Sequence, residues 1–403
     1  MNLRYIVPAL GLVAMTSAPA LAADAVPAVS FEGWVDTIFS ISDNDADDND
    51  ATAKDEESLA LRFSAAASLK ANWKVTDALT ARVNLWFNPS DDATEVDVVG
   101  LGPAAGSTNA NGLNLREAYF AWALNDTVTW SMGKYIDHIG WLSAEPTGLY
   151  TVNASLIGYT STYGNDVIGT SIAVAPKDSP ISGSFHLTNG YYTTSDALNG
   201  GPSDNRENTD LGFGLDLIYN LPQDLGSLNL EFAYDMHSDL NPVTDGDGVV
   251  GMGGDVFLVG LNATIKPAKA VLIGAELQYQ MLGEADDEGL DGATGDTDGT
   301  DADRLQGLIL VNYTIDGAPV PMSISGMIQY VQVEPGFDDS ETESRIGGAV
   351  ALLTNPLNSS NFGLNFEIGL YDVSDSFVEF DGADAVYEDD TGFVVSVEGL
   401  VTF

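Results

Sequence analysis

The 403-residue chain has no cysteine and carries 60 acidic residues against 14 basic ones, for a formal net charge of -46. The lack of cysteine excludes disulfides, thiolate metal sites and thiol nucleophiles together. The charge excludes nucleic acid as a partner, because nucleic-acid binding depends on clustered Lys and Arg that neutralise phosphates. Adaptation to a salty habitat or simple solvation of long loops would explain this acidity, and attraction of cations is the functional alternative.

The N-terminus has the pattern of an export signal. Arg4 supplies the positive start, residues 6–15 are apolar, and Ala20-Leu21-Ala22 forms a small-x-small cleavage site. We therefore expect residues 1–22 to be cleaved and residues 23–403 to form the mature domain. The apolar stretch is shorter than the roughly twenty residues that a membrane-spanning helix needs. No later uncharged run reaches that length, so the sequence predicts no transmembrane helix.

After the signal, apolar and polar residues alternate in segments of roughly ten to fourteen residues. The pattern is clear in 59–73, where every odd-numbered residue is apolar and Arg62 and Lys70 lie on the other side of the strand. It recurs in 228–237 and 271–280. This period of two is expected of a strand with one lipid face and one wet face. The sequence therefore predicts an all-β protein.

The connections between these segments are alternately short and long. Strict alternation of short periplasmic turns and long outer loops is typical of an outer-membrane barrel, and it is not expected of a soluble β-sandwich. We therefore expect a transmembrane antiparallel up-and-down β-barrel of about 16 strands. The short links are expected at 74–78, 125–126, 177–180, 266–269 and 316–319, and the long ones near 43–57, 89–111, 139–165, 193–209, 239–254, 283–303, 335–343 and 375–390.

The final segment carries its own signal. Phe393, Val395, Val397 and Val401 share one face of the last strand with Phe403, the final aromatic residue. Such an ending resembles the sorting signal that the barrel-assembly machinery reads in outer-membrane proteins. The sequence therefore predicts an outer-membrane location, contact with outer-membrane lipid, and Phe403 as an assembly signal.

Residues 113–192 carry a strand, a tight turn, a second strand with a Gly-Lys-aromatic ending, and a long loop. In these features the segment resembles the porin-2 branch of outer-membrane β-barrels, an OmpL-like family, which implies transport without fixing the solute. The family often has Phe-Gly-Tyr-Glu after the second strand, whereas here the acid is delayed to Glu145. The matching residues are Leu115-Arg116-Glu117-Ala118-Tyr119, Met132-Gly133-Lys134-Tyr135, Gly140, Ser155-Leu156-Ile157-Gly158-Tyr159 and Thr188-Asn189-Gly190-Tyr191.

The long stretch 139–165 joins the fifth and sixth expected strands. In the trimeric porins that the chain resembles in strand count, the corresponding loop folds into the barrel and narrows it. That resemblance predicts a constriction bearing Glu145, with Asp166 at its exit, and it raises a homotrimer as one assembly beside a monomer. An ordinary surface loop is the alternative.

The wet faces of the strands carry the other candidate pore residues. Arg62, Lys70 and Arg82 lie on early wet faces, where they either face the acidic loop across the pore or pair with neighbouring carboxylates. Arg304 and Arg345 are expected to pair with Glu276 or Glu367. Arg116 and Lys134 fall among apolar neighbours and are expected at the outer rim. Acidic residues outnumber basic ones on these faces, so we expect the lumen to carry a net negative charge. The acidic residues are Glu32, Asp36, Asp216, Glu231, Asp235, Glu276 and Glu367.

One acidic loop suggests a hard cation. Asp296, Asp298, Asp301 and Asp303 alternate around Gly299, which suits the oxygen ligands of calcium. The complete calcium-loop pattern with its final glutamate is missing. Diffuse attraction of counterions is therefore the competing explanation, and no other cofactor is expected.

The three histidines offer little for an enzyme. His138, His186 and His237 have no recognisable Ser-His or metal-binding spacing, and alternation places the last two on wet faces. The function predicted is a porin for passive diffusion of small hydrophilic solutes and ions, with a preference for cations. An adhesin or structural barrel, and a barrel-embedded hydrolase, remain as alternatives.

Overall fold

The structure of the chain is a computed structural model. It describes residues 28–44, 58–87, 113–143, 145–157, 166–190, 211–236, 244–245, 248–249, 256–281, 303–334, 342–358, 361–381 and 384–403. The predicted signal peptide, residues 1–22, lies outside these ranges and stays a prediction. Within the described ranges, no helix has the length and apolar character needed to cross a membrane.

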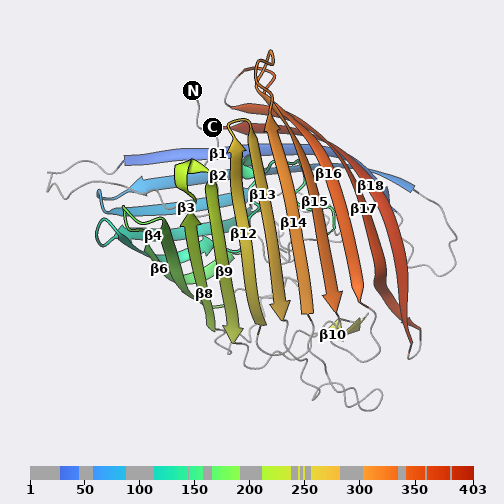
Figure 1. Cartoon of the computed structure of the whole chain (residues 1–403), viewed down its shortest axis with the longest axis horizontal. Coiled ribbons are helices and arrows are strands. Elements are labelled where there is room, and N and C mark those ends of the chain that lie inside the picture. Colours follow the sequence, from blue (N-terminus) through green and yellow to red (C-terminus); the bar gives the residue numbers. More distant parts are fainter. Residues whose placement is uncertain are drawn as a thin grey trace.

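Sixteen strands of the described residues close into one antiparallel barrel, which confirms the predicted fold class (Figure 1). Each strand pairs with its neighbours along the chain, and β1 pairs with β18 to close the ring. A separate two-stranded sheet is formed by β10 (Thr244–Asp245) and β11 (Gly248–Val249). The barrel strands are β1 (Ala28–Asn44), β2 (Ser58–Lys74), β3 (Leu79–Phe87), β4 (Leu113–Ala123), β5 (Val128–Ile136), β6 (Asp166–Val174), β7 (Ile181–Thr188), β8 (Leu211–Asn220), β9 (Gly226–Met236), β12 (Val256–Ala268), β13 (Val271–Met281), β14 (Asp303–Thr314), β15 (Met322–Glu334), β16 (Glu343–Thr354), β17 (Phe362–Asp381) and β18 (Asp384–Thr402).

The short links and the C-terminus lie at the same end of the barrel. Ala28 at the start of β1 pairs with Lys74 at the end of β2, and Trp34 pairs with Thr402 near the end of β18. The expected long loop at 375–390 is wrong, because β17 and β18 continue pairing until Asp381 faces Asp384. A strand of such a barrel can continue beyond the lipid, so a run of acidic residues does not mark where it ends.

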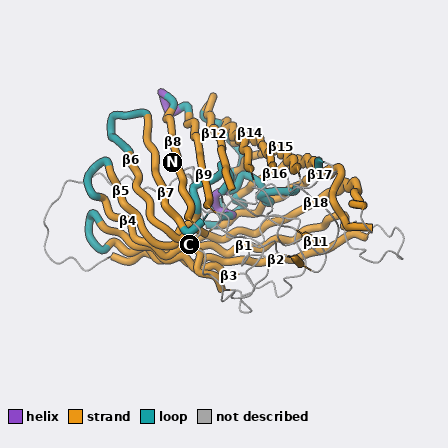
Figure 2. Tube along the Cα trace, turned by 90° about the horizontal axis from the view of Figure 1, so that it is seen from below, coloured by secondary structure: helices purple, strands orange, loops and turns teal. Residues whose placement is uncertain are grey.

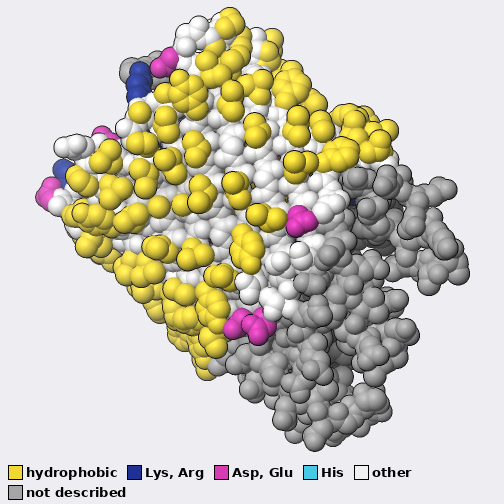
Figure 3. All heavy atoms as spheres, turned by 45° about the vertical axis from the view of Figure 1, so that its right-hand side comes forward, with side chains coloured by type: hydrophobic (Ala, Val, Ile, Leu, Met, Phe, Trp, Pro, Cys, Tyr) yellow, Lys and Arg dark blue, Asp and Glu magenta, His cyan; other side chains and the backbone are white. Residues whose placement is uncertain are grey.

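The outer surface of the barrel is apolar, as the alternation predicted. Phe63, Ile368 and Leu370 are 84%, 60% and 64% exposed on this surface. Figure 3 shows one such face covered by hydrophobic side chains. Exposed aromatic residues lie near the short-link end of several strands, where an aromatic girdle meets the lipid headgroups; they are Trp73, Trp122, Tyr219 and Tyr313.

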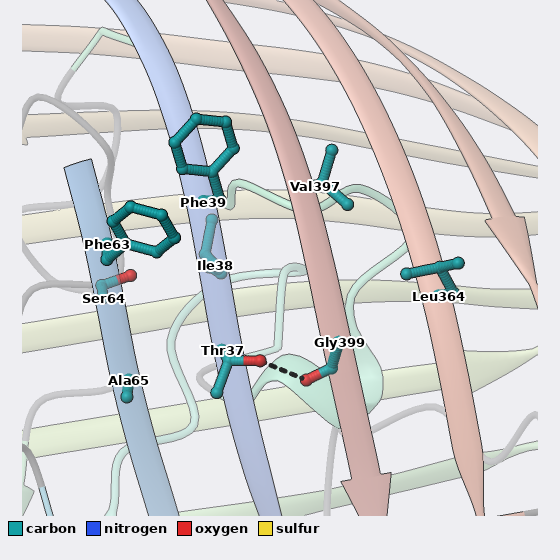
Figure 4. Close-up of a pocket in the computed structure, with 9 residues that line it drawn as sticks. All are labelled: Thr37, Ile38, Phe39, Phe63, Ser64, Ala65, Leu364, Val397 and Gly399. Atoms are coloured by element: carbon teal, nitrogen blue, oxygen red, sulfur yellow. Dashed lines mark hydrogen bonds between the residues drawn. The ribbon is translucent and has the colours of Figure 1, made fainter. Parts of the chain in front are cut away.

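A shallow apolar hollow lies on this outer surface over β2, β1, β18 and β17 (Figure 4). Small side chains at Thr37 and Ala65 and the bare backbone of Gly399 line it, and the rings of Phe39 and Phe63 border it. The Thr37 hydroxyl donates to the Gly399 carbonyl at 3.2 Å. Because the hollow faces away from the lumen, it is separate from any path for solutes.

A bulge in β4 brings Arg116 inward. The β3–β4 register shifts between Asn84, which faces Glu117, and Leu85, which faces Leu115, so Arg116 has no partner position on β3. Its guanidinium lies 4.3 Å above the centre of the Trp86 ring, and the residue is buried. The expectation of an outer-rim Arg116 is therefore wrong, because a bulge reverses the side of the strand on which the next side chain lies.

Lys134 follows the alternation instead. It pairs with Ile168, which is 49% exposed on the outer surface. Residues directly opposite each other on neighbouring strands point to the same side. Lys134 therefore faces outward near the long-loop end of β5, as expected.

Candidate functional site

The segment 137–157 passes through the inside of the barrel, and we call it the lumen loop. It leaves β5, includes the short 3-10 helix η1 (Pro146–Gly148), and makes contacts with strands on widely separated parts of the wall. Figure 2 shows the segment with η1 among the surrounding strands. The structure thus places the loop inside the barrel, where the resemblance to trimeric porins predicted it.

Two wall carboxylates hold the first part of the lumen loop. Glu231 on β9 accepts a hydrogen bond from the Gly140 amide at 2.8 Å, and Glu276 on β13 accepts one from the Trp141 amide. The Trp141 indole also donates to the Thr264 hydroxyl at 2.7 Å. These two predicted pore carboxylates therefore fix the backbone of the loop.

A third carboxylate holds the far part of the loop. Glu367 on β17 accepts from the Val152 amide at 2.7 Å and from the Asn153 side-chain amide at 2.6 Å. On β15, Gln329 donates to the Ala154 carbonyl at 2.8 Å and accepts from the Leu156 amide at 3.3 Å. The loop is therefore attached at both ends to strands that follow it, through bonds between residues 91 to 215 positions apart.

Three inward glycines form sockets for apolar side chains of the loop. The Trp141 ring lies where a Cβ on Gly274 would be, and Leu156 lies in the same way against Gly369. Ile157 packs against Gly347, where a Cβ would come within 2.9 Å of its side chain. Burial of one such side chain stabilises by about 1.5–3 kcal/mol. The apolar cluster around these sockets consists of Trp141, Leu142, Leu156, Ile157, Leu272, Leu308, Leu310, Met327, Val331, Ala349 and Val394.

Glu145 lies on the opposite side of the loop, against the early strands. Its carboxylate forms an ion pair with Lys70 on β2 and accepts from the Asn84 amide on β3 at 3.3 Å. The predicted arrangement of an acidic loop facing basic residues across the pore is therefore wrong for this pair. The two charges are in direct contact, so their fields largely cancel at the distance of a passing solute.

Arg82 on β3 is held by neighbouring wall residues. Its guanidinium lies 3.3 Å from a Glu32 oxygen and 3.8 Å from a Glu117 oxygen, and its Nε donates to Asn72 at 2.7 Å. This matches the alternative that the wet-face bases pair with wall carboxylates. Glu32 and Arg82 keep side-chain exposures of 50% and 29%, so they remain accessible from the lumen.

These residues form one cross-strand row on β1 to β4. Glu32 faces Lys70, Lys70 faces Asn84, and Asn84 faces Glu117. Lys70 and Arg82 thus lie among three carboxylates, counting Glu145 from the loop. We call this set of Glu32, Lys70, Arg82, Glu117 and Glu145 the charge-paired row.

The wall formed by β8 to β13 has a different charge pattern. Asp216, Glu231, Asp235 and Glu276 are all buried on its inner face. Within 211–236 and 256–281 the basic residues are Lys266 and Lys269, which lie at the β12–β13 turn. We call these four carboxylates the acidic wall. The alternation alone places these carboxyl groups on inner faces. The charge difference between the acidic wall and the charge-paired row depends also on which strands are neighbours around the ring.

The other predicted site residues lie apart from the row. Arg345 pairs with Glu343 rather than with Glu276 or Glu367, whose carboxylates hold the loop. Arg304 faces Gln280 in the register of β13 and β14. Arg62 faces Ser40, a buried inner-face residue, and lies nearer the long-loop end of β2 than Lys70 does.

Some predictions fall on residues whose side chains lie outside the described part of the structure. The backbone of Asp166 begins β6, but its side chain lies outside the described part of the structure. Asp296, Asp298 and Asp301 also lie outside the described ranges, whereas Asp303 begins β14 and accepts from the Tyr279 hydroxyl at 2.7 Å. The described residues contain no cluster of acidic or histidine side chains arranged for a metal ion. Calcium binding by the loop therefore stays a prediction.

The sequence did not reveal the sockets or the loop's polar partners. Gly274, Gly347 and Gly369 occupy inward positions of otherwise regular strands, and a glycine there often marks a close approach of another backbone or side chain. That signal was available but could not name what approaches. Asn153 and Gln329 gave no signal, because uncharged polar residues are ordinary on a wet face.

An apolar outer surface, a polar inner surface and an inserted loop together define an outer-membrane porin barrel. The chain belongs to the family described as "Putative beta-barrel porin-2, OmpL-like", which matches residues 28–313. This family match extends well beyond the segment 113–192 that carries the recognisable motifs.

Solved outer-membrane proteins share the fold at low sequence identity. The outer-membrane channel DcaP of Acinetobacter baumannii is 13% identical with a TM-score of 0.58, and 94% of this chain and 97% of that chain are covered. An anion-selective porin from Comamonas acidovorans is 13% identical with a TM-score of 0.56 and coverages of 94% and 100%. The trimer form of OmpT, an outer-membrane protein of Vibrio cholerae, is 13% identical with a TM-score of 0.55 and the same coverages. No curated protein matches the chain.

Proposed function

We propose that this porin allows passive diffusion of small hydrophilic solutes and ions and prefers cations. The observation that carries the preference is the contrast between the charge-paired row and the acidic wall. On the row, Lys70 and Arg82 are within ion-pair distance of carboxylates, so the net field there is small. On the acidic wall, four carboxyl groups lie buried on the lumen side, and the Lys and Arg residues within 211–236 and 256–281 are confined to the β12–β13 turn. Surplus carboxylate raises the local concentration of cations.

The apolar cluster directs the path of the solute. It packs one side of the lumen loop against β13 to β18, whereas Glu32 and Arg82 keep exposed side chains on the other side. These accessible charged side chains therefore lie on the early-strand side of the loop. This position favours small hydrophilic solutes, because the accessible groups there are charged or polar.

The alternatives gain less support. A hydrolase needs an oriented Ser-His pair, and the Ser184 hydroxyl does lie 2.8 Å from Nε2 of His186. However, the other ring nitrogen faces the Tyr135 hydroxyl at 3.4 Å rather than a carboxylate, and both Ser184 and His186 are buried. An adhesin is favoured by no specific contact in the described part of the chain.

The test is the reversal potential of the purified protein in a planar bilayer under a KCl gradient. We expect the sign for cation preference, and a smaller value for Asp216→Asn, which removes a carboxylate of the acidic wall that does not hold the loop. The matched control is Asp77→Asn, which removes the same charge from an exposed turn. Anion preference of the unmodified protein, or equal effects of the two variants, would contradict the proposal.

For assembly we propose a homotrimer inserted through the C-terminal strand by the barrel-assembly machinery. The trimer form of the similar OmpT barrel supports this at the level of the fold. Native mass measurement of the unheated protein in detergent distinguishes a trimer from a monomer. A mass of one chain would contradict the proposal.

A further inference from the structure

Two histidines stack where the lumen loop begins. The rings of His138 and His186 have centroids 4.1 Å apart and planes inclined by only 6°. His138 is the second residue after β5, and His186 lies on the inner side of β7. The stack therefore joins the start of the lumen loop to β7, a wall strand that carries none of the other anchors described above.

The polar neighbours of the stack suit neutral rings. The Ser184 hydroxyl and the Tyr135 hydroxyl lie at the two nitrogens of His186, and a hydroxyl can donate to one neutral ring nitrogen and accept from the other. Burial, followed by the proximity of His186, holds the pKa of His138 well below its usual range. A backbone hydrogen bond at Phe232 on β9 acts in the opposite sense, because it raises the pKa of His138. Burial and the neighbouring His186 therefore keep His138 uncharged at neutral pH.

Apolar packing surrounds the next residue of the loop. Ile139 is 3% exposed and packs with Val167, Ala233, Val256 and Leu258. The apolar packing around Ile139 gives little screening, so two imidazolium rings in contact would repel each other at close range. The titratable and charged groups on the elements around the stack are Tyr135 on β5, Asp137 in the loop, Asp216 on β8, and Glu231 and Asp235 on β9.

We propose that the His138–His186 stack positions the root of the lumen loop, and that acid releases this root by charging the two rings. His138 and His186 are positioning residues on this view, since they act on the solute path through the loop. The inference rests on the channel function proposed above for its electrical consequence, but the release of the root does not depend on conduction.

The sign of the pH effect follows from linkage. A free histidine has a pKa near about 6.5, whereas the stacked form resists protonation, so protons bind the released root more strongly than the stacked one. The stack is therefore fully present at pH above about 6.5 and weakens as pH falls. Below that value, the equilibrium shifts toward release by about tenfold per pH unit for each ring that is charged only on release.

The remaining anchors keep the loop inside the barrel after release. Gly140 stays bonded to Glu231, and Glu145 stays paired with Lys70. Only residues 137–139 gain freedom, so we expect current fluctuations of an open channel rather than loss of the barrel.

The first test compares single-channel recordings of the unmodified protein with His138→Phe at pH 7.5 and pH 5. Phe keeps a ring to stack on His186 but cannot be charged, and it leaves every carboxylate in place. We expect the rate of current fluctuations to rise at least about tenfold for the unmodified protein and to stay nearly constant for the variant. If both channels respond equally to acid, carboxylates elsewhere cause the effect and the proposal is overturned.

The second test does not require conduction. Hydrogen exchange of the amides of residues 137–139, corrected for the intrinsic rate of each sequence, is compared between the same two proteins at pH 5.5. Faster exchange in the unmodified protein supports the proposal, and equal exchange overturns it. If His138→Phe does not give a heat-modifiable barrel, His186→Phe serves as the uncharged variant. A protein that passes this test but conducts no ions would contradict the channel function and leave the stack intact.

Discussion

Phe403 closes the barrel by a pair of backbone hydrogen bonds to Gly33. The Gly33 amide donates to the Phe403 carbonyl at 3.0 Å, and the Phe403 amide donates to the Gly33 carbonyl at 3.1 Å. The Phe403 ring lies over Gly33, where a Cβ would overlap it. The last residue of the chain therefore completes the β1–β18 pairing, and it lies 57% exposed on the outer surface with Val401.

Deletion of Phe403 is expected to slow insertion, because it removes both bonds, each contributing about 0.5–1.5 kcal/mol, together with the exposed terminal ring. Heat-modifiable mobility on gels measures the folded fraction, and periplasmic accumulation measures the delay. The control is Val401→Ala, which trims the same outer face without removing a closing bond. A deletion variant that folds as fast as this control would contradict the role of Phe403 as an assembly signal.

Gly274→Ala is expected to displace the Trp141 ring from its socket. Overpacking of this kind costs about 1–3 kcal/mol, so the temperature at which the barrel unfolds on gels should fall and channel conductance should change. Gly326→Ala is the matched control, since a Cβ on Gly326 meets no atom within 4 Å. Equal stability of the two variants would mean that the loop yields easily at Trp141.

Glu145→Gln is expected to shift selectivity toward anions, because it leaves the positive charge of Lys70 without its partner. Lys70→Gln should shift selectivity toward cations, and the double variant should lie near the unmodified protein. Reversal potentials measure all three. Single variants whose shifts do not have opposite signs, or a double variant that stays as far shifted as Glu145→Gln, would contradict the cancellation of charge between Glu145 and Lys70.

The aspartates of the first long loop provide a contrast in range. Asp43, Asp45, Asp47, Asp48 and Asp50 changed together to Asn should reduce cation preference mainly at low salt, because fields in water decay within about 8 Å at 0.15 M salt. The effect of Glu145→Gln should persist at high salt, since close charges are screened less. The same reversal potentials at two salt concentrations check this. A loop effect that survives high salt would place those aspartates near the narrowest part of the pore.

Glu367→Gln is expected to weaken the far attachment of the lumen loop by about 1–3 kcal/mol. The Glu367 carboxylate now accepts hydrogen bonds from the Val152 backbone amide and the Asn153 side-chain amide. In the variant an NH2 group replaces one of its two oxygens, so one of these donors loses its acceptor. Thermal unfolding followed by gel mobility measures the loss. Glu343→Gln is a control at an ion pair near the end of a strand, and an equal loss there would show that the Glu367 contacts add no particular stability.

Much of the fold could be predicted because a barrel wall repeats one simple pattern. The alternation in 59–73 assigned Lys70 to the lumen correctly, since a regular strand has a period of two. It failed at Arg116, where a single bulge reverses the sides, and at 375–390, where acidic residues continue a hairpin. Local pattern describes each strand but not its distant neighbours.

The candidate site was predictable only in its residue types. Glu231, Glu276 and Glu367 were correctly expected as inward carboxylates, but their hydrogen bonds go to the backbone of the lumen loop. The sequence separation between these partners ranges from 91 to 215 residues. No local pattern encodes such a meeting, which depends on how the ring closes.

The distant attachment of the lumen loop has a consequence for the order of folding. The side chain of Asn153 bonds to Ser396, which follows it by 243 residues. Contacts of such long range form only after the intervening chain has been ordered. The loop therefore belongs to the first half of the chain in synthesis but to the last steps of maturation. Until the final strands are in place, the far part of the loop lacks its attachment to Glu367 and Ser396, so the width of the pore is set only when the ring is complete.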